Sequence, residues 1–188
     1  RLKAAAFDAD DLDRVAWDDT RDTPQFLAGD LGPVDRSAPE ASAAAFLHAN
    51  AGLFGFKAAP DVVPTRVVAD KDGALHVFSL QTVRGVPVWG AESALHVDGS
   101  GRAYAWGGDV HPEAEAVDTA PALDARIATA LAIDALGDVR LRESEGSTEL
   151  PGDLPDWSPQ ADLVVLPHGD GYRLAYYVRV FVEAPAPA

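Results

Sequence analysis

The stretch that decides the fold reads HVFSLQTVRGVPVWG and runs from His76 to Gly90. Apolar and polar residues alternate on both sides of Arg84-Gly85, as they do in two strands that are joined by a tight turn. Because so short a connection joins only antiparallel neighbours, we expect a β-hairpin here. Pro87 has no backbone N–H to donate, so we expect its part of the second strand at a sheet edge or in a bulge.

Similar alternation continues on both sides of this hairpin and predicts an antiparallel meander. Turns rich in Gly and Asp, at Asp70–Gly73 and Asp98–Gly101, separate its members. The expected strands cover residues 65–69, 74–83, 86–89, 93–97 and 102–106, with one more near 25–28.

A helix is expected to begin near Ser37, ahead of the meander. Ser37 and Glu40 have the spacing of a capping box, and Pro39 stands in the first turn, where its missing N–H costs nothing. Gly52 is the expected end of this helix.

A second helix is expected after the meander. Thr119 is its predicted N-cap, with Pro121 in the first turn. Leu123, Ile127, Leu131 and Ala135 then follow at a spacing of four, and Gly137 is the expected end.

The last part of the chain predicts a loop over 138–156 that holds at most one short strand, and then a hairpin. Its strands are expected at 162–166 and 172–182, and residues 184–188 resemble a linker. The pattern as a whole is typical of an α+β protein made of two small modules, each an antiparallel sheet packed with one helix. We place the boundary between 1–112 and 113–188.

Composition restricts the function. The 188 residues are 47% hydrophobic, which is enough to form a core. A net charge of −15 argues against nucleic acid, because phosphate binding needs clustered Lys and Arg. The longest apolar runs are too short for membrane insertion. The chain begins at Arg1 and has no Met, so we expect a piece of a longer product.

Catalytic equipment is not evident in the sequence. There is no Cys, and none of the five His stands in H-E-x-x-H. His76 and His96 lie on neighbouring expected strands and can approach each other, but partly exposed strand residues are the favoured interpretation over a metal site. A Gly-rich phosphate loop and a nucleophile elbow are also missing. We therefore expect neither an enzyme nor a cofactor in this chain.

One family resemblance stands out in the stretch quoted first. Gln81-Thr82, the turn at Arg84-Gly85, then Val86-Pro87-Val88 and Trp89-Gly90, closely resemble the FTP module of fungalysin and thermolysin propeptides. The helix beginning at Pro121 and the strand over 174–180 resemble the PepSY module that follows it in that family.

The resemblance implies a propeptide of a secreted zinc metalloprotease, which would be an intramolecular chaperone and inhibitor. Its partner would be the cognate catalytic domain, and the zinc would belong to that domain downstream. A secreted, periplasmic or extracellular location follows. One departure is that the family's final strand, beyond the one matching 172–182, is not seen before Ala188.

Two alternatives stay open at this point. Gln81, Arg84 and Trp89 are either architectural or in contact with the protease. The chain could instead be a stand-alone PepSY-like protein of the cell envelope that binds or regulates a protease.

Overall fold

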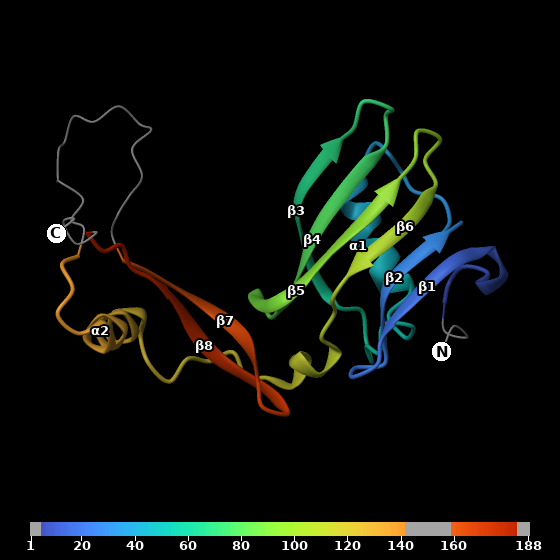
Figure 1. Cartoon of the computed structure of the whole chain (residues 1–188). Helices are drawn as coiled ribbons and strands as arrows, with labels where there is room; N and C mark the ends of the chain where they lie inside the picture. The colour runs from blue at the N-terminus through green and yellow to red at the C-terminus, as the bar shows by residue number, and fades with distance from the viewer. Residues whose placement is uncertain (1–4, 142–158, 184–188) are drawn as a thin grey trace. The chain divides into compact units, whose positions relative to one another are not determined.

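β-strands dominate the structure, a computed structural model that describes residues 5–141 and 159–183 (Figure 1). Within these residues it has eight strands and two α-helices, as expected of an α+β protein. The strands are β1 (Leu12–Asp18), β2 (Thr23–Gly29), β3 (Asp61–Ala69), β4 (Leu75–Val83), β5 (Val86–Val97), β6 (Ala103–Gly108), β7 (Gln160–His168) and β8 (Gly171–Arg179). The helices are α1 (Pro39–Ala49) and α2 (Ala125–Leu136), with short 3-10 helices η2 (Ala9–Asp11) and η3 (Pro112–Ala116).

The predicted meander is confirmed. Six strands pair antiparallel in the order β1-β2-β6-β5-β4-β3, and Val83 faces Val86 across the turn of the β4–β5 hairpin. The segments expected at 86–89 and 93–97 are one strand, because Gly90 has φ 78° and lets β5 bend instead of ending. Strand β1 was not predicted, and it pairs with β2 along the edge of the sheet.

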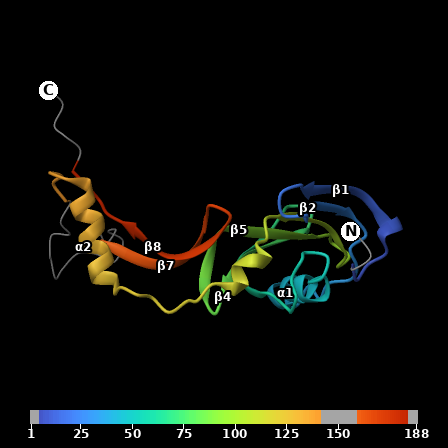
Figure 2. The same cartoon turned by 90° about the horizontal axis from the view of Figure 1, so that it is seen from below.

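One face of this sheet is covered by α1, as Figure 2 shows. The largest fully buried side chains are Trp106 and Phe54, whose ring centroids lie 4.5 Å apart. Leu27, Val77 and Val97 pack into the same cluster and are fully buried. This apolar layer between helix and sheet forms the main core.

Both helices begin differently from the sequence-based expectation. Ala38 is the N-cap of α1 without a side-chain cap, because the Ser37 hydroxyl donates to the Asp35 carboxylate 2.7 Å away. The predicted capping box is therefore wrong. In α2 the N-cap is Asp124, which accepts a hydrogen bond from the Ile127 N–H at 2.9 Å, so the start predicted near Thr119 is wrong too. Gly137 ends α2 as predicted.

The closing hairpin forms, although β8 ends at Arg179 and does not reach Val182. Val182 instead makes an isolated antiparallel bridge with Leu141. The predicted loop lies mostly, and the predicted linker wholly, outside the described residues.

Packing groups the chain into two units. The first consists of Arg1–Thr119 with Val165–Arg173, and the second of Ala120–Val164 with Leu174–Ala188. The turn of the β7–β8 hairpin thus belongs to the first unit and its open end to the second. In the second unit, the Tyr176 hydroxyl donates to the Leu123 carbonyl at 2.9 Å, just ahead of α2.

Candidate functional site

The turn of the β4–β5 hairpin is the first part of the candidate site. Arg84 and Gly85 both have positive φ, at 50° and 80°, which is the geometry of a two-residue turn that matches the twist of its strands. Arg84 donates from Nη1 to the Val117 carbonyl at 2.7 Å. The Gly85 N–H donates to an Asp61 carboxylate oxygen at 3.2 Å. The turn is thus tied both to β3 and to the segment after η3.

Gln81 holds the chain just before η3. Its amide Nε2 donates to the His111 carbonyl at 2.9 Å, and its Oε1 accepts from the His111 N–H at 2.8 Å. Gln81 is 3% exposed and His111 is 5% exposed, so both hydrogen bonds are shielded from water. The Gln81 side chain thus pairs with both the N–H and the C=O of His111, which fixes the path of the chain at that residue.

The ring of His111 makes two further contacts. Its Nδ1 lies 2.9 Å from the Tyr172 hydroxyl, at the start of β8, and the ring also hydrogen-bonds the backbone of Gly90. Burial lowers the pKa of His111, and the Arg21 guanidinium lowers it further. Burial likewise raises the pKa of the Tyr172 hydroxyl. Both shifts favour the uncharged forms, so a neutral imidazole and a protonated hydroxyl share this hydrogen bond.

A second apolar cluster surrounds these polar contacts. It lies between the hairpin, η3 and β7, and Val88 pairs in parallel with Val165. Its buried members are Val83, Val88, Ala91, Ala114 and Val165, with Val86, Val117 and Tyr172 packed against them. This cluster thereby joins the hairpin tip, η3 and β7 within the first unit.

Pro87 lies beside a bulge, which agrees with one of its two predicted positions, a sheet edge or a bulge. Thr82 faces Pro87 while Leu80 faces Glu92, so residues 88–91 of β5 have no partner on β4. The bulge frees Val88 for its pairing with β7. Thr82 is buried, and its Oγ1 has no hydrogen-bond partner among the described residues.

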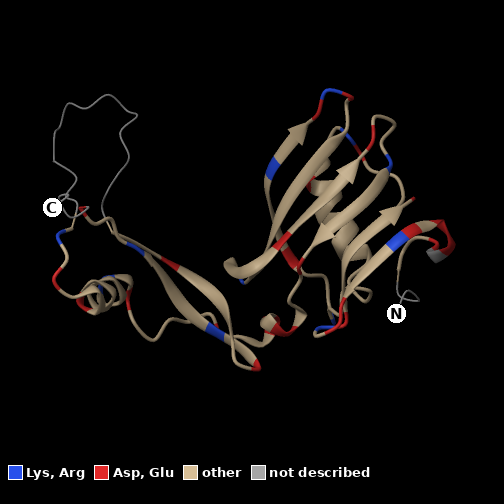
Figure 3. Ribbon diagram, in the orientation of Figure 1, with Lys and Arg blue, Asp and Glu red and all other residues tan. Residues whose placement is uncertain are grey.

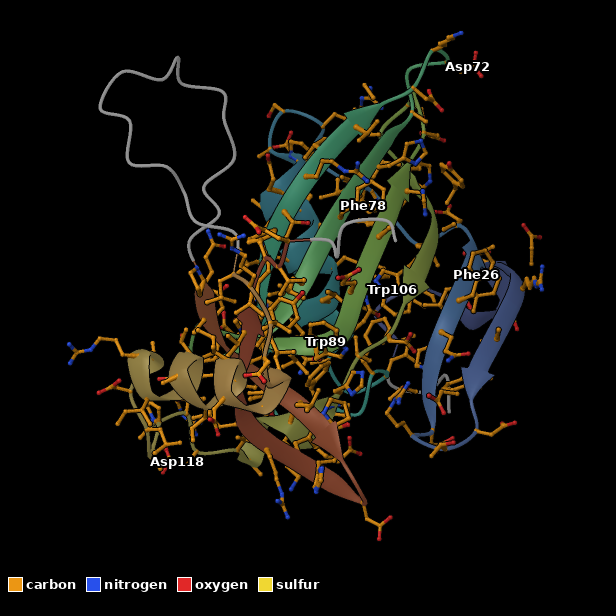
Figure 4. All side chains as sticks on the ribbon, turned by 60° about the vertical axis from the view of Figure 1, so that its left-hand side comes forward. Phe26, Asp72, Phe78, Trp89, Trp106 and Asp118 are labelled. Atoms are coloured by element: carbon orange, nitrogen blue, oxygen red, sulfur yellow. The ribbon has the colours of Figure 1, made fainter. Side chains whose placement is uncertain are left out.

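Trp89 is the signature residue with a large apolar side chain that is exposed, at 49%. It lies in the bulged part of β5, where Figure 4 labels it. The geometry thus separates the predicted site residues into two kinds. One kind shapes the hairpin and its contacts: Gln81, Thr82, Arg84, Gly85, Val86, Pro87 and Gly90. The other is Trp89, which is about half exposed to solvent.

Sequence reasoning missed His111 and Tyr172, which complete this arrangement. His111 was noted only as a histidine outside any metal-ligand spacing. The sequence held one local indication that the backbone of His111 is restricted, because Pro112 follows it and a proline restricts the residue before it. Nothing local could have indicated that Tyr172, 61 positions later, lies against its ring.

A metal centre with three or more protein ligands and a membrane-spanning helix are both absent from the described residues. No group of three or more His, Cys, Asp or Glu there is arranged to hold a metal ion. No helix in that part of the chain is long and apolar enough to cross a membrane.

Figure 3 shows acidic positions at the β3–β4 turn and in η3.

Comparison with known proteins identifies the region that contains the hairpin. Residues 61–110 match the family described as the fungalysin/thermolysin propeptide motif. The chain carries this propeptide motif. The motif runs from β3 almost to His111 and includes every signature residue from Gln81 to Gly90. It indicates a non-catalytic segment, and propeptides of this family belong to secreted proteases.

Curated relatives agree with the motif. Neutral protease B of Bacillus subtilis (strain 168) is 26% identical over 178 residues, covering 92% of this chain and 31% of the relative. Bacillolysin of Bacillus subtilis subsp. amylosacchariticus is 30% identical over 145 residues, covering 76% and 26%. Bacillolysin of Bacillus cereus is 27% identical over 184 residues, covering 94% and 30%.

The chain therefore spans less than a third of the length of these relatives. The predicted resemblance to propeptides of thermolysin-like metalloproteases is confirmed. The PepSY-like interpretation of the later half stays a prediction.

Proposed function

We propose that this chain is the propeptide segment of a secreted zinc metalloprotease, in which it assists folding of the catalytic domain and inhibits it. The propeptide motif over residues 61–110 is the observation that carries this proposal. Relatives named as proteases, each more than three times as long as the aligned part, support it. The zinc and the catalytic groups would then belong to a domain outside this chain.

The partner in this proposal is the cognate catalytic domain, and Trp89 is its proposed contact on the hairpin. A half-exposed tryptophan beside a rigid turn has the chemistry of an interface anchor, because it buries a large apolar surface at low cost in conformational entropy. Gln81 and Arg84 take the architectural role, since their polar atoms bind backbone carbonyls of this same chain.

The exposed face of α2 is a second region suited to a partner. Ile127 is 46% exposed and Leu131 is 57% exposed, one turn apart on the same side of the helix. Apolar side chains gathered on one helix face favour association with another protein over exposure to water.

A refolding experiment tests the proposed chaperone role. The cognate catalytic domain is unfolded and then diluted into buffer with or without this chain, and its peptidase activity is followed. We expect the chain to raise the recovered activity in proportion to its concentration up to one equivalent. Equal recovery with this chain and with an unrelated acidic protein would contradict the proposal.

Trp89→Ala separates partner contact from folding of the propeptide itself. Losing an interface anchor costs about 1.4 kcal/mol or more, which weakens inhibition about tenfold. The thermal midpoint of the chain should stay within about 2 °C of the original, because the replaced side chain is half exposed. Asp72→Ala, at the distant β3–β4 turn, is the matched exposed control and should leave inhibition unchanged (Figure 4).

A further inference from the structure

Two histidines meet across the β4–β5 ladder, on the other side of the sheet from the main core. His76 on β4 and His96 on β5 are directly paired, between Val68 on β3 and Ala105 on β6. Their neighbours Val77 and Leu95 are buried in the core that α1 covers. Because successive side chains of a strand point to opposite faces, the two imidazoles lie on the face away from α1.

The two rings meet at their Nδ1 atoms. His76 Nδ1 lies 2.6 Å from His96 Nδ1, with ring centroids 4.9 Å apart. The His76 side chain is 23% exposed, so solvent and small ions reach the pair. Two imidazole nitrogens this close together can bind the same transition-metal ion once the hydrogen bond between them is replaced.

A carboxylate orients one of the rings. Asp70, in the turn before β4, places Oδ2 3.6 Å from His76 Nε2. Its other oxygen is already occupied, because Oδ1 accepts from the Asp72 and Ala74 N–H groups at 3.0 and 2.8 Å. Figure 4 labels Asp72 at this turn and Phe78 on the following strand, which bracket His76. A carboxylate behind the far nitrogen of a histidine is the usual support of a metal-binding imidazole.

We propose that His76 and His96 form a two-histidine site for a divalent transition metal, with Asp70 as a positioning residue. The ion binds both Nδ1 atoms, and water fills its remaining positions. The Asp70 carboxylate keeps the proton of His76 on Nε2. Without metal, His96 carries its proton on Nδ1 and donates it to His76 Nδ1; when the ion binds, this proton moves to His96 Nε2. No proton is released in the exchange.

Cu²⁺ and Ni²⁺ need a smaller separation of the two nitrogens than Zn²⁺ does. With metal–nitrogen bonds of about 2.0–2.1 Å, a right angle at the metal needs nitrogens about 2.9 Å apart, and a tetrahedral angle about 3.3 Å. The observed 2.6 Å is a hydrogen-bond distance, so the two nitrogens must move apart by about 0.3 Å to reach the first value and by more to reach the second. The general order of divalent-ion affinities also puts Cu²⁺ first. This site lies within the propeptide motif but is independent of the proposed protease function.

Titration of the full chain with Cu²⁺ alone tests the proposal. We expect one ion per chain with electron paramagnetic resonance features of two nitrogen donors, and a rise in thermal midpoint of about 5–10 °C when free Cu²⁺ exceeds Kd a hundredfold. His76→Gln and His96→Gln should each abolish the two-nitrogen signal and the rise. His168→Gln removes an exposed histidine on β7 and should keep both.

Asp70→Asn provides the test of positioning. The asparagine oxygen can still accept the two turn hydrogen bonds of Oδ1, while the group facing His76 changes from an acceptor to a donor. We expect Cu²⁺ to bind about 10–100 times more weakly, with the two-nitrogen signal kept at saturation. Because Asp70→Asn does not remove a ligand, it still tests the proposed site if a histidine variant fails to fold. Wild-type affinity in Asp70→Asn, or equal affinity in wild-type and His96→Gln, would overturn the proposal.

Discussion

Gln81→Leu is the substitution that most sharply tests how the hairpin holds the first unit together. It removes both hydrogen bonds to the His111 backbone but keeps most of the side-chain volume. His111 is 5% exposed, so its N–H and C=O cannot turn to water. Each stranded group costs about 1–3 kcal/mol, and added apolar burial offsets a part, so we expect a loss of about 2–4 kcal/mol.

Urea unfolding followed by tryptophan fluorescence measures this loss, because Trp106 lies in the main core of the same unit. A loss of about 3 kcal/mol should also lower the thermal midpoint by about 6–12 °C. Thr82→Val is the matched control on the next residue: it is buried, but its hydroxyl has no partner among the described residues. The control should be neutral or slightly stabilising. If Gln81→Leu behaves like Thr82→Val, the account of the hairpin is refuted.

Two further substitutions test the turn and the buried histidine. Gly85→Ala should destabilise the fold by about 1–2 kcal/mol through its φ of 80° alone, because no atom lies within 4 Å of the added Cβ. Gly99→Ala, at a position without a positive φ, should cost less. Equal urea midpoints for the two variants would contradict this. Burial lowers the pKa of His111 below 6.5, so the unfolded chain binds more protons than the folded chain. The free energy of unfolding should therefore fall as the pH drops below 6.5 and passes through the pKa of the folded state. Urea midpoints at about pH 7.5 and pH 5 should therefore differ more in wild type than in His111→Asn, and equal differences would exclude this role for His111.

The hairpin and the α+β class could be predicted because their signals are local. Alternation around Arg84-Gly85 determines both strands and the turn between them. The position of Pro87 beside a bulge is one of the two that its missing N–H predicted, the other being a sheet edge.

What sequence reasoning missed depends on tertiary contacts. Ser37 is a good N-cap by type, but the nearby Asp35 carboxylate takes its hydroxyl. The role of Gln81 becomes visible only when His111, 30 positions later, is brought to its amide. The approach of His76 and His96 was expected from their neighbouring strands, but their direct pairing depends on the register, since a slip by one residue would have separated the rings.

Inhibition of the cognate mature protease by this chain tests the central claim most directly. Peptide hydrolysis is measured against increasing concentrations of the chain, with wild type, Trp89→Ala and Asp72→Ala compared. The account predicts saturable inhibition at one chain per enzyme, weakened about tenfold in Trp89→Ala and unchanged in Asp72→Ala. Full protease activity at every concentration of the folded chain, together with no gain in refolding yield, would contradict it.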